Sequence, residues 1–325
     1  MISLIATVLN EGDSIHLLFN SIAAQTRQPD EIVIVDGGSS DNTCEIIAGY
    51  RDRLPVRLLV EPGCNISQGR NRAIDAAAGE IIAVSDAGVQ LSATWLESIT
   101  EPLLLNPDLQ GVAGFFLADP QSAFEVALAA ATLPLRDEIK PEAFLPSSRS
   151  VAFRKSAATE IAGYPEWLDY CEDLVFDLRF RAAVGRFAFA PTALVYFRPR
   201  ASIGSFYRQY FLYARGDGKA DLWLKRHVLR YAAYWLLAPA IFLLGALIEP
   251  YWWALVLPGA AIYLYRPYRR LPAVMRPWPG KSPFARIYCI LMIPLVRLVG
   301  DIAKMHGYPA GRLWRWRRKP PAWRL

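Results

Sequence analysis

The sequence predicts an α/β protein with a mostly parallel sheet, followed by a helical region that associates with a membrane. Three observations indicate this. Short apolar runs alternate with helical patterns in the first part of the chain, long uncharged runs follow residue 230, and residues 266–325 are strongly basic. Alternation of strands and helices is typical of parallel sheets, because parallel neighbours need a long crossover that is usually a helix.

The elements of the first part can be placed in order. Apolar runs predict strands at residues 2–9, 31–36, 56–60 and 80–86. Apolar residues at helical spacing predict helices between them, at residues 13–24, 42–51 and 67–78. The strands are apolar almost without interruption, which is typical of a sheet with both faces covered. We therefore predict a parallel sheet between two layers of helices.

Polar residues gather where these strands end. Asn10 and Glu11 follow the first strand, Asp36 and two glycines end the second, and Asp86 ends the fourth. Ligands of open α/β sheets bind beyond the carboxyl ends of the strands. Three groups that are distant in sequence are therefore expected at one rim.

The loop "DGGSSDNT" after the second strand has two interpretations. Its glycines would let the backbone approach a ligand, and Asp36 could accept hydrogen bonds from a ribose or a base. Alternatively it is an ordinary turn in which Asp41 caps the next helix. The first strand is not followed by GxGxxG, so the fingerprint of a dinucleotide-binding fold is missing.

Charge divides the chain. The net charge is +6, but residues 266–325 hold fourteen Lys or Arg and one acid, Asp301, so the rest is acidic. The four cysteines have neither zinc-ligand nor CxxC spacing, which fits a reducing cytosol. The N-terminus lacks a basic signal-peptide region and fits a first strand better. The three histidines form no cluster, and no Ser-His-Asp pattern is present.

Two uncharged runs predict a membrane hairpin, with spans at residues 231–248 and 251–265. The alternative is a buried helical hairpin of a soluble domain. A third apolar stretch predicts an interfacial helix at about residues 285–304. Basic residues after the hairpin place the body on the cytoplasmic side of a cell inner membrane or plasma membrane. The final "RLWRWRRKPPAWRL" favours anionic membrane lipids over nucleic acid as its partner.

Five segments together resemble family 2 glycosyltransferases, which are inverting enzymes with a GT-A fold that use nucleotide sugars. The resemblance covers Met1 to about Gly218. It is carried by "ATVLNEGDSI", "EIVIVDGGSSDNT", "GRNRAIDAAAGEIIAVSDAGVQLSATWLE", "AGYPEWLDYCEDLVFDLRFR" and "RQYFLYARGDG". It implies a GT-A domain at residues 1–225 and a membrane-associated region at residues 226–325.

The resemblance also implies a nucleotide-sugar site. Residues matching Glu11 and Asp36 hold the base and ribose in that family, Arg70 matches a position near the diphosphate, and Asp86 opens a DxD motif that reaches ribose and metal. The whole expected site comprises Thr7, Asn10, Glu11, Asp36, Gly37, Ser39, Arg70 and Asp86. The donor would be a UDP- or GDP-sugar.

The sequence departs from that pattern at two places. Gly88 stands where DxD has its second acid, and Tyr196, Phe197 and Arg198 occupy the region where the family often has a metal-binding His. One possibility is Mg²⁺ or Mn²⁺ held by Asp86, water and the diphosphate. The other is that arginines supply part of the positive charge. The candidates, which could instead contact the membrane surface, are Arg198, Arg200, Arg208 and Arg215.

Glu172 and Asp173 form the other acidic position. The resemblance implies that they lie beside the acceptor, and that Asp173 is the base that takes the proton of the acceptor hydroxyl. Acids also stabilise the start of a helix, which is the simpler explanation. A polyprenyl phosphate acceptor would need no base, because it is already ionised.

Together these features predict an inverting glycosyltransferase at the cytoplasmic membrane face. Its acceptor would be a lipid-linked saccharide or a saccharide, in glycolipid or cell-surface polysaccharide synthesis. The alternatives are a polyprenyl-phosphate glycosyltransferase and a non-catalytic nucleotide-binding membrane protein.

Overall fold

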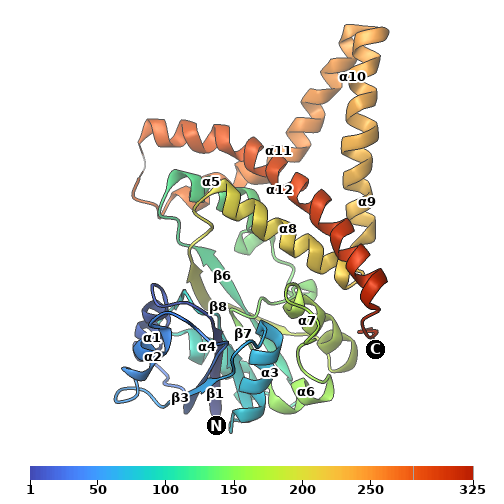
Figure 1. The fold of residues 1–325 in the computed structure, drawn as a ribbon. Helices are drawn as coiled ribbons and strands as arrows, with labels where there is room; N and C mark the ends of the chain where they lie inside the picture. The colour runs from blue at the N-terminus through green and yellow to red at the C-terminus, as the bar shows by residue number, and fades with distance from the viewer. Residues whose placement is uncertain (281, 325) are drawn as a thin grey trace. The chain divides into compact units, whose positions relative to one another are not determined.

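The computed structural model describes residues 1–280 and 282–324. Lys281 and Leu325, which belong to the predicted basic region, lie outside the described residues. The chain forms two compact units (Figure 1). The first contains residues 1–117 and 136–198 with the last residues of the chain, and the second contains residues 118–135 and 199–319. Composition changes near residue 225, but the compact units do not divide there, so the predicted functional boundary at 225 stays a prediction.

An eight-stranded mixed sheet forms the centre of the first unit, in the order β3-β2-β1-β4-β7-β6-β8-β5. The strands are β1 (Ile2–Val8), β2 (Glu31–Asp36), β3 (Val56–Val60), β4 (Ile81–Val84), β5 (Val89–Leu91), β6 (Gly111–Ala118), β7 (Val151–Arg154) and β8 (Ala188–Phe197). Strands β1 to β4 are parallel, which confirms the predicted parallel core. The pairs β4–β7, β6–β7 and β5–β8 are antiparallel, and the sequence pattern did not predict these later strands.

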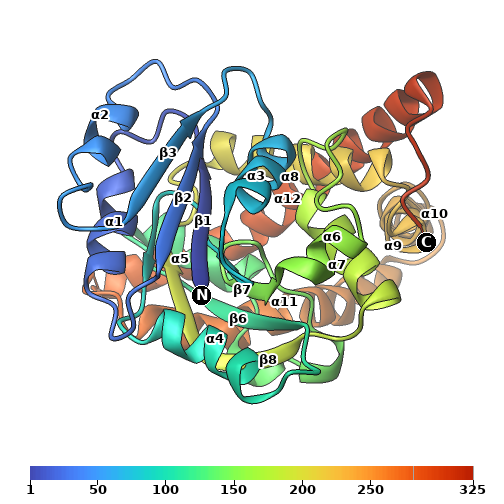
Figure 2. The same ribbon diagram turned by 90° about the horizontal axis from the view of Figure 1, so that it is seen from below.

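Helices cover both faces of this sheet. They are α1 (Ile15–Ala23), α2 (Thr43–Ala48), α3 (Ile66–Ala76), α4 (Trp95–Leu105), α6 (Lys155–Glu160) and α7 (Glu172–Ala183), with short 3-10 turns η1 (Arg136–Glu138) and η2 (Pro141–Ala143). Leu4 packs in one apolar cluster with residues of α1 and α4, whereas the next residue, Ile5, packs in a second cluster with residues of α3, α6 and α7. Figure 2 shows α1 and α2 on one side of the parallel strands and α3 on the other. Burial on both faces explains why the central strands are apolar almost without interruption.

Helices alone make up the second unit. They are α5 (Ala123–Thr132), α8 (Ile203–Lys219), α9 (Leu224–Ala232), the π-helical η3 (Ala233–Leu237), α10 (Ala238–Leu247), the 3-10 helix η4 (Pro250–Leu255), α11 (Val256–Met275) and α12 (Pro283–Arg318). Helix α12 packs against α8 and α5 through Val126, Phe206, Cys289 and Val296. A Cβ atom at Gly307 would clash with the backbone of α8, so glycine permits the close approach of these two helices.

One helical stretch in the described residues is long and apolar enough to cross a membrane. Leu224–Leu247 has a mean hydropathy of 1.5, and only 6% of its apolar window is buried, which is unlike a core helix. It contains nearly all of the first predicted span. The second predicted span, at residues 251–265, is divided between η4 and α11, so the two-span hairpin stays a prediction.

The predicted interfacial helix at about residues 285–304 is too short. Helix α12 continues to Arg318, so much of the "RLWRWRRKPPAWRL" segment is helical rather than an extended tail. Leu, Arg and Trp in this segment are compatible with a helix. Its packing on α8 adds the tertiary contacts on which helical stability mostly depends.

Candidate active site

The loops that follow β1 and β2 are joined by side chain to backbone hydrogen bonds. The Asn10 amide donates to Ser39 Oγ at 2.8 Å, and Asn10 Oδ1 accepts from the Ser40 amide at 2.9 Å. The Gly37 amide donates to the Val8 carbonyl at 2.9 Å. Asn10 has a φ of 55°, a left-handed conformation that asparagine tolerates better than most residues. The predicted residues Asn10, Gly37 and Ser39 therefore lie together at the sheet rim.

Asp36 is fully buried and organises its own loop. Its Oδ1 accepts from the amides of Gly38 and Ser39 at 2.8 Å each, and its Oδ2 accepts from Ser39 Oγ at 2.5 Å. A carboxylate offers about four acceptor positions, so most of its capacity is already used. The predicted ribose contact of Asp36 stays a prediction, and it would use the remaining capacity.

Glu11 is held by the same pair of loops. Its amide donates to Thr43 Oγ1 at 2.8 Å, and its carboxylate accepts a hydrogen bond from the Ser14 hydroxyl. Asp41 accepts from the Gly12 amide and from Thr43. The simpler interpretation of the "DGGSSDNT" turn, local capping by Asp41, therefore describes part of what the loop does.

Helix α3 delivers Arg70 into the interior. A capping box of Asn65 and Gln68 begins this helix, which fixes the first turn. A Cβ atom at Gly69 would come 2.7 Å from Thr7 Cγ2, so glycine lets the helix lie against β1 at the predicted site residue Thr7. Arg70 follows and is only 2% exposed.

Arg70 joins the two acidic positions of the predicted site. Its Nη2 donates to Asp86 Oδ1 at 2.8 Å, and its Nη1 donates to Glu172 Oε1 at 2.7 Å. Burial disfavours the charge, but the combined attraction of these carboxylates raises the pKa of Arg70 above its ordinary value. The planar guanidinium group is suited to such a fork of two charge-assisted bonds. Residues 102 positions apart are thereby brought together.

A second arginine, which the sequence did not reveal, faces Asp86 from the other side. Arg149 Nε lies 3.8 Å from Asp86 Oδ2, and its guanidinium group lies 4.3 Å from the centre of the Phe197 ring. Asp86 is partly exposed, so it stands between two cations at an open position. Arg149 precedes the short strand β7, where no local pattern distinguishes it from a surface residue.

Gly88 has a structural reason of its own. Its φ is +68°, which L side chains rarely adopt, and a Cβ atom would lie 3.1 Å from Ser14 Oγ and 3.3 Å from Glu11 Oε2. A second acid at this position would be strained in this turn and would lie close to the Glu11 carboxylate. The backbone conformation therefore favours glycine over the second acid of a DxD motif.

The acidic pair Glu172 and Asp173 begins α7 after Cys171, whose φ of 64° is also left-handed. Burial, and then repulsion from Asp173, raise the pKa of Glu172 to about 7, against the attraction of Arg70. Burial also raises the pKa of Asp173, and Arg70 again opposes the shift. Asp173 Oδ1 accepts from the Leu174 amide at 2.8 Å, whereas Glu172 is tied to Arg70. The two carboxylates are therefore held differently.

Asp177 is a third acid, one turn further along α7, which the sequence reasoning missed. It is 2% exposed, and its Oδ2 has no hydrogen-bond partner among the described residues. Burial, and then the charge of Asp173, raise the pKa of Asp177 well above its ordinary value. The spacing of four residues from Asp173 was the available signal, since such residues share a helix face.

The residues present do not form a protein-held metal site. No group of three His, Cys, Asp or Glu in the described part of the chain could hold a metal ion. One Asp86 oxygen accepts from Arg70 and the other faces Arg149, and Gly88 supplies no second carboxylate. Hard cations need several oxygen ligands, so the protein alone supplies too few.

The four arginines predicted to contact a diphosphate are divided between the units. Arg198 is exposed at the end of the first unit. Arg200, Arg208 and Arg215 belong to the second unit, the latter two on α8. Their contact with a diphosphate stays a prediction.

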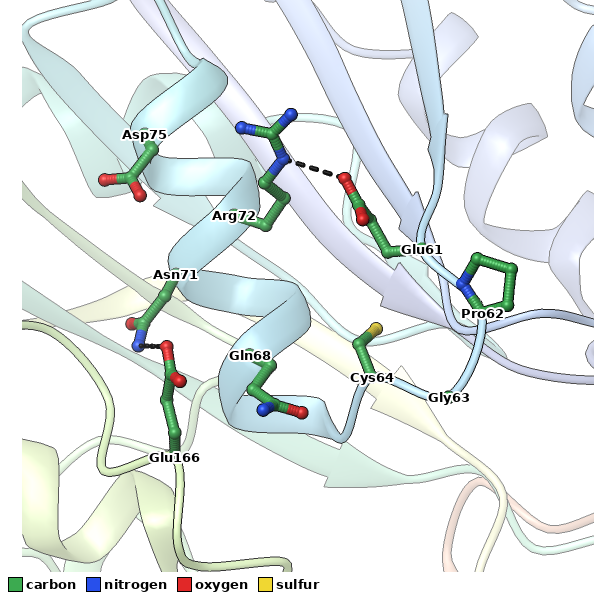
Figure 3. A pocket seen from close by; sticks show the side chains of 9 residues that line it. All are labelled: Glu61, Pro62, Gly63, Cys64, Gln68, Asn71, Arg72, Asp75 and Glu166. Atoms are coloured by element: carbon green, nitrogen blue, oxygen red, sulfur yellow. Dashed lines mark hydrogen bonds and ion pairs between the residues drawn. The ribbon is translucent and has the colours of Figure 1, made fainter.

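A depression of about 480 Å³ lies on the outer side of α3 (Figure 3). In it Arg72 Nε donates to Glu61 at 2.9 Å, and Asn71 Nδ2 donates to Glu166 at 3.0 Å. None of its nine lining residues belongs to the predicted site. Its polar side chains largely pair with one another, so we assign it no role.

Comparison with known proteins gives a consistent result. Residues 3–156 match the family model described as Glycosyl transferase family 2. The chain is 35% identical over 99 residues to an uncharacterized glycosyltransferase, YibD, of Escherichia coli, which is 30% of this chain and 29% of that protein. It is 27% identical over 267 residues to the succinoglycan biosynthesis protein ExoA of Rhizobium meliloti, which is 77% and 78% of the two chains.

Among solved structures, the fold is similar to that of the mannosyltransferase PcManGT from Pyrobaculum calidifontis in complex with GDP-Man and Mn²⁺. The TM-score is 0.63 at 17% identity, over 94% of this chain and 86% of the other. At this identity the likeness concerns the fold.

The strand order, the acidic rim and these similarities define a glycosyltransferase with a GT-A fold. Residues 3–156 therefore form a family 2 glycosyltransferase domain.

Proposed function

We propose that this protein transfers a sugar, with inversion, from a UDP- or GDP-sugar to a hydroxyl acceptor at the cytoplasmic face of a membrane. The observation that carries the proposal is the junction at Arg70, which connects Asp86 at the end of β4 with Glu172 at the start of α7. Asp86 belongs to the predicted donor side and the acidic pair to the predicted acceptor side. One buried guanidinium group thus couples both halves of the site.

The donor would bind along the rim formed by the loops after β1, β2 and β4. Glu11 and Asp36 would contact the base and ribose. Arg70 and Arg149 provide positive charge beside Asp86, where a diphosphate would sit. Fixed positive charge stabilises the negative charge that develops on a leaving diphosphate.

Asp173 is the better base of the acidic pair. Glu172 is ion-paired to Arg70 at 2.7 Å, and taking a proton would remove the negative charge that this pair depends on. Asp173 is partly exposed, is not part of the Arg70 fork, and has a raised pKa, which favours proton uptake. The acceptor hydroxyl would give its proton to Asp173 as its oxygen bonds to the anomeric carbon. The bond from that carbon to the diphosphate oxygen would break, and the nucleoside diphosphate would leave.

The membrane assignment rests on the second unit. The apolar stretch Leu224–Leu247 is long enough for one span and is largely unburied. Basic residues of α12 would add attraction to anionic lipids. The similar protein ExoA is a succinoglycan biosynthesis protein, which supports an acceptor in cell-surface polysaccharide assembly.

The donor site could also use a divalent metal ion. PcManGT was solved with GDP-Man and Mn²⁺, which supports a nucleoside diphosphate sugar and a metal in this fold. With one carboxylate at Asp86, an ion here would be held mainly by the diphosphate itself. Since the protein supplies too few metal ligands, we assign to Arg70 and Arg149 the protein's part in stabilising the negative charge of the leaving diphosphate.

Incubating membranes that contain the full chain with a panel of labelled nucleotide sugars tests the function. Labelled lipid-linked or saccharide product should form with one donor, and a chelator arm reports the need for metal. A product sensitive to mild acid, as a sugar phosphate is, would favour the polyprenyl-phosphate alternative. Nucleotide binding with neither transfer nor hydrolysis would favour the non-catalytic alternative.

A further inference from the structure

A cavity of about 730 Å³ lies within the second unit, and none of the residues that line it is assigned to glycosyl transfer. Its walls come from the end of α5 and from α8, α11 and α12. The residues that line it are Ala131, Thr132, Tyr210, Ile262, Tyr263, Tyr265, Arg266, Pro267, Arg270, Arg297 and Lys304.

Four of the lining residues are cationic, and none is acidic. Arg266 and Arg270 are one helical turn apart on α11, and Arg297 and Lys304 are two turns apart on α12. Each pair therefore shares one helix face. Two helices thus direct their positive charges at the same space.

Asp301, which lies between Arg297 and Lys304 on α12, attracts Lys304, but its oxygens accept hydrogen bonds from other residues. Asp301 Oδ2 accepts from the Tyr263 hydroxyl at 2.6 Å and from the Tyr234 hydroxyl at 3.2 Å. Its Oδ1 accepts from Arg230 Nε at 2.9 Å, and Arg230 does not line the cavity. Asp301 is therefore occupied in fastening α9, η3 and α11 to α12.

Two of the lining cations are incompletely compensated by hydrogen bonds or opposite charge. Arg297 Nε is buried with no hydrogen-bond partner among the described residues. Burial, and then repulsion from Arg230, lower the pKa of Lys304 to about 8. A buried donor without a partner is costly, and an anion placed in the cavity would remove that cost.

The surroundings of the cavity indicate what kind of anion would fit. Arginine forks match phosphate oxygens, and Arg297 and Lys304 lie over the rings of Tyr263 and Tyr210, 4.5 and 4.9 Å from the ring centres. Ile262, a lining residue, is 80% exposed, and Tyr265 also lines a neighbouring apolar depression on α11 with Ala261 and Leu264. A charged cavity beside exposed apolar surface suits an amphiphile with a phosphate head.

We propose that the cavity enclosed by α5, α8, α11 and α12 binds a phosphoryl anion, with Arg297 and Lys304 as its central contacts. The phosphoryl group is carried by a lipid headgroup or is free phosphate. This site shares no residue with the predicted donor site and does not depend on which residue is the catalytic base.

Binding to the purified full chain in neutral detergent tests the proposal. The probes are short-chain phosphatidic acid, neutral dioctanoylglycerol and inorganic phosphate, each measured by calorimetry. The pocket variant is Arg297→Gln with Lys304→Gln. The matched control is Arg286→Gln with Arg317→Gln, which removes two exposed cations from the same helix. The charge-preserving pair Arg297→Lys with Lys304→Arg tests for loss of folding.

We expect phosphatidic acid to bind more tightly than the neutral lipid, and the pocket variant to weaken this roughly tenfold or more. The control and the charge-preserving pair should stay within about threefold of the full chain. The same pattern with inorganic phosphate alone would identify free phosphate as the source. Equal losses in pocket and control variants, or no binding of either anionic probe, would overturn the proposal. Nucleotide affinity, measured on the same samples, reports separately on the donor site.

Discussion

Arg70 Nη1 lies 2.7 Å from Glu172 Oε1 in a side chain pair that is almost completely buried. The same guanidinium group reaches Asp86 at 2.8 Å. A single residue of α3 therefore connects the carboxyl end of β4 with the start of α7. Each of the following predictions depends on this junction or on the unit that carries the apolar helix.

Replacing Arg70 with Met should destabilise the protein by on the order of 3 kcal/mol, because it leaves the buried Glu172 carboxylate unpaired. The thermal unfolding midpoint of the full chain would fall by several degrees. Arg72→Met on the exposed face of the same helix removes only a surface pair with Glu61 and should change little. In a Glu172→Gln background, Arg70→Met should lower the free energy of unfolding by less than it does in the unaltered protein. An equal loss in both proteins would contradict the buried ion pair.

Asp86→Asn should reduce turnover on the order of 100-fold or more, since losing one preorganised charge at the reacting centre typically has this effect. The fold should survive, because an amide can still accept from Arg70. Asp75→Asn, which changes an exposed acid of α3, is the control. Near-normal steady-state turnover of a folded Asp86→Asn protein would remove Asp86 from the donor site.

The raised pKa of Glu172 predicts a specific pH dependence of stability. The folded value is about 7 and the ordinary value is 4.5, so the folded state holds a proton that the unfolded state releases. This contribution to stability is complete below about pH 4.5 and is lost as the pH rises through about 7. Between these values stability should fall by at most about 1.4 kcal/mol per pH unit from this group.

Glu172→Gln cannot titrate and should remove this part of the slope. Unfolding midpoints of both proteins, measured from pH 4.5 to pH 7.5 in one buffer series, provide the comparison. Parallel curves would mean that Glu172 is ionised throughout.

The apolar helix should determine membrane retention. Arg in place of both Leu236 and Leu237, near the middle of the Leu224–Leu247 stretch, opposes insertion by roughly 2.5–3.5 kcal/mol per residue. The variant should leave the membrane fraction on alkaline washing, whereas the full chain should remain. Arg at both Leu104 and Leu105, an exposed leucine pair of α4, is the matched control. If the unaltered chain were released without detergent, the membrane assignment would fail.

Truncation at residue 225 is a poor test of the same point. Helix α12 supplies Cys289, Ile293 and Val296 to the apolar clusters that bury Val126, Leu128 and Phe206. Its removal would expose the core of the second unit. The change in composition near residue 225 therefore does not mark a place where the chain can be cut cleanly.

The sequence predicted strands β1 to β4 because each is a continuous apolar run between helical patterns. It could not reveal β5 and β7, which are three and four residues long and have no measurable period. The contact of Arg149 with Asp86 joins two loops far apart in the chain, so no local pattern could show it. The position of Asp36 at the sheet rim was predicted. The hydrogen bonds that its carboxylate accepts from Gly38 and Ser39 of the same loop were not predicted.

At Gly88 the structure adds most to what the DxD motif alone suggests. The sequence leaves open whether the missing second acid weakens a metal site. The left-handed turn at Gly88, beside Ser14 and Glu11, gives the glycine a backbone role. In the proposed donor site, Arg70 and Arg149 would supply part of the positive charge beside Asp86, and no sequence pattern indicated Arg149.

The assignment of Asp173 as base is tested most directly by Asp173→Asn, with nucleotide affinity and turnover measured on the same preparation. The amide keeps the size of the side chain but cannot take a proton at neutral pH. Glu160→Gln on the exposed face of α6 is the control. We predict nearly unchanged nucleotide affinity by calorimetry and a fall in transfer to a hydroxyl acceptor of roughly 100- to 10,000-fold. Intact turnover would contradict the role of Asp173 and favour Glu172 or an already ionised phosphate acceptor, and lost nucleotide affinity would assign Asp173 to the donor site instead.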